Sequence, residues 1–148
     1  TGRQSVSLPE ADAAALKTFL SNGGFLVAEA GLGDKRFDAA FRALAGQLGL
    51  RMTPVGKDDP LVSGKFTGGA GCAVENVHFT FALRPERIGR AHPELYRLTL
   101  DGKPVGVYSP FDLSYCQTGM DAFDCRGYEP EDARAVLANV LIAAACRP

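Results

Sequence analysis

The sequence lacks an excess of charge of either sign, a long hydrophobic run and closely paired cysteines. Its formal net charge is −1 over 148 residues, and the basic and acidic residues are dispersed along the chain. Because there is no basic stripe, we expect neither nucleic-acid binding nor a polybasic membrane contact. The longest apolar run, residues 136–146, is interrupted by Asn139 and is well short of the ~20 residues that span a bilayer. We therefore expect a soluble segment without direct membrane insertion.

The four cysteines are spread along the chain, at Cys72, Cys116, Cys125 and Cys146. They form no C-x-x-C pair, and only His78 and His92 could join them as ligands. Zinc ligands usually occur as closely spaced pairs, so the sequence predicts no metal site, and we expect no cofactor. An even number of cysteines fits two disulfides in an exported protein or four thiols in a reducing compartment. No signal-peptide pattern is visible at Thr1, so we expect a mature product or an excised piece.

The length is that of one domain, and apolar residues at helical spacing predict three helices within it. The expected ranges are residues 8–22, 34–48 and 130–146. Ser7 and Glu10 fit a capping box for the first helix, and Asp34 fits the N-cap of the second. In the third helix, Asn139 lies beside the apolar stripe, where a polar amide needs a hydrogen bond. We expect that bond to reach the preceding loop.

Strands are predicted from apolar runs and from alternation of apolar and polar residues. The expected ranges are residues 25–28, 51–55, 77–83, 95–100 and 103–108. The last two flank Asp101 and Gly102, which are typical of a two-residue hairpin turn. Residues 77–83 alternate with apolar side chains on one face, which places His78 on the solvent face. Together these elements predict an α/β domain with helices on a mixed sheet.

The segment VGVYSPFDLS, residues 105–114, is predicted to be a core strand that feeds a site-forming loop. In open α/β sheets, ligands bind beyond the carboxyl ends of such strands. Acids and hydroxyls at these ends are the candidate ligand-binding residues, namely Glu29, Asp34, Ser109, Asp112 and Ser114. The alternative is that Asp112 and Ser114 only satisfy the backbone of their own turn.

The catalytic alternative to this ligand-binding site is a cysteine-dependent hydrolase or amidotransferase. It would use Cys72 as the nucleophile, with His92 and Glu94 as its partners. The usual strand-to-helix elbow has glycines on either side of the cysteine, whereas Ala70 and Val74 stand there. His92 also follows Cys72 by only 20 residues. A chance match in a loop is the simpler interpretation.

Cys116 and Cys125 lie in one long loop after residues 105–114, with eight residues between them. A loop of this length inside a compact domain needs an anchor. In an oxidising compartment we expect a disulfide between them, which would stabilise the fold by ~2–3 kcal/mol on the chain-entropy model. In a reducing compartment both would be free thiols.

The motifs SNGGFLVAEAG, FDAAFRAL, LTLDGKPVGVYSPFDLSYC and CRGYEPEDARAVLANVLIAA cover most of the chain. With these motifs the sequence resembles a bacterial domain family of unknown function, family four-one-five-nine. The resemblance implies a class I glutamine amidotransferase-like, flavodoxin-type fold: a three-layer α/β sandwich with a mostly parallel sheet plus an antiparallel hairpin. It places the first strand of that fold upstream of Thr1. Glu29 and Asn139 match an acid and an asparagine that members usually have, but the family has no established catalytic residues to carry over.

Family members usually form the carboxyl end of larger proteins, some of them membrane-anchored. The resemblance therefore implies that residues 1–148 are one domain of a larger envelope-associated protein, in a periplasmic or other extracytoplasmic position. We expect a non-catalytic module that binds a ligand, other domains of the parent protein or envelope proteins. A carbohydrate-binding or sugar-processing domain is a further alternative. It requires exposed aromatic side chains beside Asp112, from among Tyr108, Phe111, Tyr115 and Tyr128.

Overall fold

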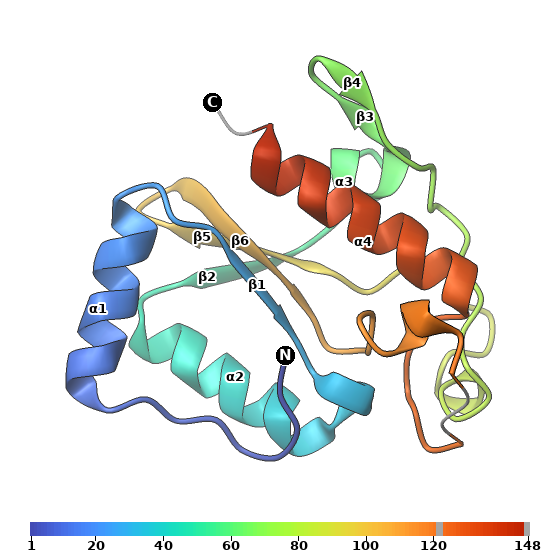
Figure 1. Cartoon of the computed structure of the whole chain (residues 1–148), viewed down its shortest axis with the longest axis horizontal. Coiled ribbons are helices and arrows are strands. Elements are labelled where there is room, and N and C mark those ends of the chain that lie inside the picture. The colour runs from blue at the N-terminus through green and yellow to red at the C-terminus, as the bar shows by residue number, and fades with distance from the viewer. Residues whose placement is uncertain (121–122, 147–148) are drawn as a thin grey trace.

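The computed structural model describes residues 1–120 and 123–146, and its centre is a four-stranded sheet (Figure 1). The strand order is β1-β6-β5-β2, with bounds Leu26–Glu29 for β1, Lys103–Ser109 for β6, Tyr96–Leu100 for β5 and Arg51–Pro54 for β2. Strands β1 and β6 run parallel, whereas the β6/β5 and β5/β2 pairs are antiparallel. A small separate hairpin consists of β3, Lys65–Phe66, and β4, Gly69–Ala70.

Helices cover both faces of this sheet (Figure 1). One face carries α1, Glu10–Ser21, and α2, Lys35–Gln47, and the other carries α3, Pro60–Ser63, and α4, Pro130–Ala145. Three 3-10 turns lie in the connections: η1, Gly31–Gly33, η2, Arg84–Glu86, and η3, Cys116–Thr118. None of the described helices is long and apolar enough to cross a membrane.

Helix α2 follows the sequence pattern closely. Its apolar residues Phe37, Phe41 and Leu44 are buried, as helical spacing requires. The Asp34 carboxylate accepts hydrogen bonds from the backbone N–H groups of Arg36 and Phe37, and so caps the free donors of the first turn. The predicted N-cap is confirmed. By contrast, α1 begins after Pro9 without a side-chain cap, so the predicted capping box is wrong.

The hairpin of β5 and β6 is also confirmed, and it contains a bulge. Asp101 and Gly102 have φ values of 50° and 79°, as both central residues of a type I′ turn require. The register then shifts, so that Val105 has no partner between the Leu98/Gly106 and Thr99/Pro104 pairs. Because of this bulge, Val105 and Val107 face different cores although they are two residues apart.

The predicted three-layer sandwich with a mostly parallel sheet is wrong. The structure has a mixed sheet of four strands in which only β1 and β6 are parallel. The physical reason is the position of the hairpin: β6 pairs with β1 and β5 pairs with β2, so antiparallel pairs fill the rest of the sheet.

The predicted strand over residues 77–83 is also wrong. This segment makes one isolated bridge, between Phe79 and Tyr128, and then turns into η2. Val77, Phe79 and Leu83 are buried, but they pack in the core under α4 rather than along a sheet. The alternation of apolar and polar residues therefore predicts correctly which apolar side chains are buried, except at Phe81, which is 67% exposed.

Candidate functional site

The predicted site lies at the carboxyl ends of the parallel pair, where Glu29 of β1 stands beside Ser109 of β6. Both residues are buried, and so is Asp112 in the loop that follows β6. This loop, residues 110–129, leads from β6 to α4 (Figure 1). The predicted core strand, and the loop that follows it, are therefore found where the sequence placed them.

Glu29 binds the backbone of this loop. Its Oε2 accepts hydrogen bonds from the N–H groups of Leu113 and Ser114 at 3.0 and 3.1 Å, and its Oε1 accepts one from the Ser114 hydroxyl. Glu29 is 5% exposed, so these donors replace water around its buried carboxylate. Glu29 and Ser114 thus hold the start of the loop against the end of β1.

Asp112 binds two further segments. Its Oδ2 accepts from the Leu32 N–H in η1 at 2.6 Å, and its Oδ1 accepts from the N–H groups of Tyr115 and Cys116 at 2.9 Å. Ser109 fixes the turn at the end of β6, because its hydroxyl donates to the Phe111 carbonyl at 2.6 Å. Both oxygens of each carboxylate therefore have partners within the fold. The alternative that Asp112 and Ser114 only satisfy their own turn fits Asp112 in part, through Tyr115 and Cys116, whereas the Ser114 hydroxyl bonds Glu29 instead.

Asp34 belongs to the same edge of the molecule but has a separate role as the cap of α2. Its pKa is lowered to about 2, chiefly by the hydrogen bond from the Phe37 N–H and also by the Arg36 side chain. The structure thus brings Glu29, Ser109, Asp112 and Ser114 together, while Asp34 is occupied by its helix.

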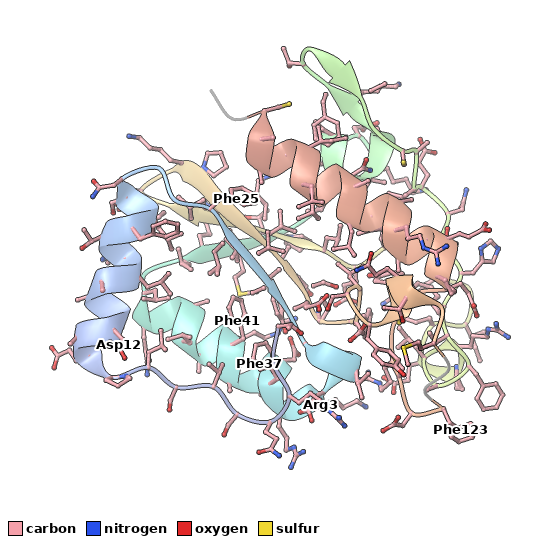
Figure 2. The ribbon with its side chains drawn as sticks, in the orientation of Figure 1. Arg3, Asp12, Phe25, Phe37, Phe41 and Phe123 are labelled. Carbon is pink, nitrogen blue, oxygen red and sulfur yellow. The ribbon has the colours of Figure 1, made fainter. Side chains whose placement is uncertain are left out.

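The outer side of the same loop forms a pocket of about 400 Å³. Cys116 and Cys125 line its floor, and its rim includes Phe81, Met120 and Phe123. The two phenylalanine rings lie with their centroids 5.5 Å apart, and Phe123 is 84% exposed. Figure 2 shows Phe123 pointing outward at the end of the molecule far from α1. This rim was not among the predicted features. The sequence feature that points to it is Phe123, a large aromatic residue within an otherwise polar loop.

Cys116 and Cys125 are buried beneath this rim, with their Sγ atoms 3.3 Å apart. A disulfide has an S–S length of ~2.05 Å, so both are free thiols here, and the pairing stays a prediction. The hydrogen bond with Cys125, and then burial, raise the pKa of the Cys116 thiol far above its usual value.

The residues of the cysteine-dependent alternative do not meet through any of the described hydrogen bonds. Cys72 is exposed, and its backbone is bound by the Asn139 amide. His92 Nε2 lies 3.1 Å from the Val55 carbonyl, and the Glu94 carboxylate binds Arg87 and Tyr96 instead. No helix follows Cys72 directly, so the elbow geometry of such nucleophiles is absent from this described segment.

Asn139 has the structural role predicted for it, with a different partner. Its Nδ2 donates to the carbonyls of Leu61 and Cys72, and its Oδ1 accepts from the Cys72 N–H. The bound segment is therefore residues 61–72 rather than the loop just before α4.

The carbohydrate alternative required exposed aromatic rings beside Asp112. Tyr108, Phe111 and Tyr128 are buried, and Tyr115 is only partly exposed. Sugar binding needs ring faces that are open to solvent, so three of the four named residues count against this alternative.

The fold and the site define a mixed α/β domain in which buried carboxylates hold a loop that bears an apolar-rimmed pocket. A family model described as "Domain of unknown function (DUF4159)" matches residues 1–144, and the chain belongs to this family. The match confirms the family that the sequence motifs indicated. It does not extend to an amidotransferase-like fold or to a bacterial origin. No curated protein matches the chain.

Proposed function

We propose that this domain is a non-catalytic binding module, and that the pocket rim holds an apolar side chain of a partner polypeptide. The observation that carries the proposal is the exposed aromatic pair Phe81 and Phe123 beside Met120. Large apolar side chains gathered around a hollow typically mark interaction sites. Aromatic anchors in pockets also supply most of the free energy of binding at protein interfaces.

The polar candidates support binding rather than catalysis. A catalytic carboxylate needs a free oxygen near the reacting atoms. Asp112 instead uses both of its oxygens to bind backbone N–H groups inside the domain. Glu29 binds two backbone N–H groups with Oε2 and the Ser114 hydroxyl with Oε1. Their role is to set the shape of the loop and, through it, the shape of the pocket.

A polypeptide fits the pocket better than a small molecule or a membrane surface. Small-molecule sites bury most of their ligand, whereas this rim extends its apolar contact area outside the hollow. Charges beside the rim are of mixed sign and include the ion pair of Arg84 and Glu129, with 2.7 Å between Nη2 and Oε1. An anionic lipid surface would require a surplus of basic residues instead.

Peptide selection tests the proposal. A random peptide display library is selected on the immobilised domain, and enriched peptides are measured against the double variant Phe81→Ser, Phe123→Ser. We expect peptides with an aromatic or large aliphatic anchor, and an affinity at least about tenfold weaker for the double variant.

Ile88→Ser is the matched control, because Ile88 is 85% exposed but does not line the pocket. It should bind the selected peptides like the wild type. Equal affinity for the wild type and the double variant would contradict the proposal, as would selection of peptides without an apolar anchor.

We also propose that the domain is part of a larger bacterial envelope-associated protein and lies on the extracytoplasmic side. The sequence motifs support this through the family resemblance described above. Protease added to spheroplasts that carry the tagged full-length protein should then remove this domain. Protection of the domain until the cells are lysed would contradict an extracytoplasmic position.

A further inference from the structure

Three side chains with metal-binding atoms come together where Cys116 and Cys125 line the pocket. They are Asp112, Cys116 and Cys125, and one carboxylate oxygen and the two sulfurs lie within 4.8 Å of one another. All three residues are buried. The turn of η3 brings Cys116 beside Asp112, and the return of the loop toward α4 brings Cys125 to them.

We propose that Asp112, Cys116 and Cys125 bind a Zn²⁺ ion at the floor of this pocket. Two thiolates and a carboxylate are a ligand set that zinc accepts, with a fourth position for water or another ligand. The proposal concerns the domain alone, so it does not depend on the partner proposed above. It requires Cys116 and Cys125 to stay reduced, so the metal takes the place of the disulfide expected for an oxidising compartment.

The separation of the two sulfurs favours a metal over a disulfide. Two sulfurs bound tetrahedrally at ~2.3 Å from zinc are roughly 3.8 Å apart, whereas the sulfurs of a disulfide are ~2.05 Å apart. The observed 3.3 Å between the Sγ atoms of Cys116 and Cys125 is nearer to the metal-bound separation. Metal binding therefore requires the smaller movement.

The surroundings hold these ligands as the outer shell of a metal site does. The Asp112 carboxylate is fixed by backbone N–H groups from both η1 and the start of η3. The Thr80 hydroxyl donates to the Cys125 carbonyl at 2.6 Å and accepts from the Gly127 N–H at 3.1 Å. Gly127 itself leaves the space for the cluster, because a Cβ at this position would overlap Cys116 Sγ.

Access and charge are also compatible with an ion. Both cysteines line the pocket, which supplies a route from solvent. Each thiol must lose its proton to become a ligand, so binding of one Zn²⁺ releases two protons. The resulting pair of thiolates and the carboxylate carry three negative charges against the two positive charges of the ion. The backbone N–H groups around Asp112 offset part of that surplus.

The test is titration of the reduced, metal-free domain with Zn²⁺, followed by calorimetry in two buffers that differ in ionisation enthalpy. We expect one ion per chain and about two protons released. Co²⁺ should give the absorption bands of thiolate-bound cobalt. Cys116→Ser and Cys125→Ser should each weaken Zn²⁺ binding by more than about 100-fold, beyond the usual cost of losing an outer-shell group.

The matched control is the double variant Cys72→Ser, Cys146→Ser, which removes the two exposed cysteines outside the cluster and should bind Zn²⁺ like the wild type. Circular dichroism of each variant shows whether it is folded. The proposal is overturned if the folded, reduced wild type binds no stoichiometric Zn²⁺, or if the control loses binding. It is also overturned if protein isolated from cells without reductant carries a Cys116–Cys125 disulfide and no metal.

Discussion

Glu29 and Asp112 show how two buried acids can organise a loop. Each carboxylate binds at least two backbone N–H groups that no regular secondary structure satisfies. An N–H group buried without a partner costs ~1–3 kcal/mol, and hydrogen bonds to charged groups are stronger than those to neutral ones. At the scale of single residues, the loop therefore depends on these two side chains.

Replacing Glu29 with Gln tests this role. The glutamine keeps the shape of the side chain and can turn its carbonyl oxygen toward the N–H groups of Leu113 and Ser114, but it lacks the negative charge that strengthens both bonds. We expect the free energy of unfolding to fall by about 2–3 kcal/mol, measured by urea denaturation at pH 7. Glu75→Gln alters an exposed glutamate and should change it by less than about 0.5 kcal/mol. Equal stability of the two variants would show that Glu29 is not needed.

Among the elements, those set by local rules were the ones that the sequence could predict. Helix α2 has both its apolar spacing and its cap within a few residues, and the β5/β6 hairpin is set by Asp101 and Gly102. The bounds of α4 likewise follow from Pro130 and the apolar stripe behind it. Residues 77–83 were misassigned because alternation reports which side chains are buried, while a strand also needs a neighbouring strand to pair with.

The cap of α2 gives a pH-dependent prediction. The folded-state pKa of Asp34 is about 2, below the value of ~3.9 for an unfolded aspartate. The stability from this carboxylate is therefore present above pH ~4 and is lost as the pH falls from there toward 2. Urea denaturation of the wild type and Asp34→Asn should show a stability difference that is constant from pH 7 to 5 and shrinks below pH 4. A difference independent of pH would contradict the role of the ionised cap.

The close approach of β1 and β6 gives a second prediction at the scale of elements. A Cβ on Gly106 would overlap the Leu26 carbonyl oxygen of the neighbouring strand. Gly106→Ala should therefore force the parallel strands apart and lower the free energy of unfolding by about 1–3 kcal/mol. Gly46→Ala, in α2 with open space around it, should instead raise it by up to about 1 kcal/mol. Thermal unfolding followed by circular dichroism separates the two outcomes.

For the molecule as a whole, topology was the part that was predicted wrongly from the sequence, because a mostly parallel sheet was expected and only β1 and β6 are parallel. The motifs indicated the family and the order of most elements, but not which strands are neighbours. That choice depends on contacts between distant segments, such as β1 with β6. The candidate site was also predicted only in part. Glu29 and Asp112 could be placed at one edge of the sheet, because each follows a predicted strand. Only the folded loop shows that their oxygens are occupied and that Phe81 and Phe123 are exposed together.

The two cores on opposite faces of the sheet lead to a prediction about the whole chain. Leu44 of α2 is buried in one core, and Leu61 of α3 is buried in the other. The sheet belongs to both cores, since Val107 faces one and Tyr108 the other, so we expect the domain to unfold as one cooperative unit. Leu44→Ala and Leu61→Ala should each cost about 2–5 kcal/mol.

Pulse-labelling hydrogen exchange with mass spectrometry at increasing urea concentration checks this expectation. In each variant, peptides from α2 and from α4 should become labelled at the same, lowered midpoint. Leu141→Ala, at a position 65% exposed on α4, should leave the midpoint almost unchanged. If Leu44→Ala lowered the midpoint of α2 alone, the two faces would be separate folding units, because the shared sheet would then fail to couple them.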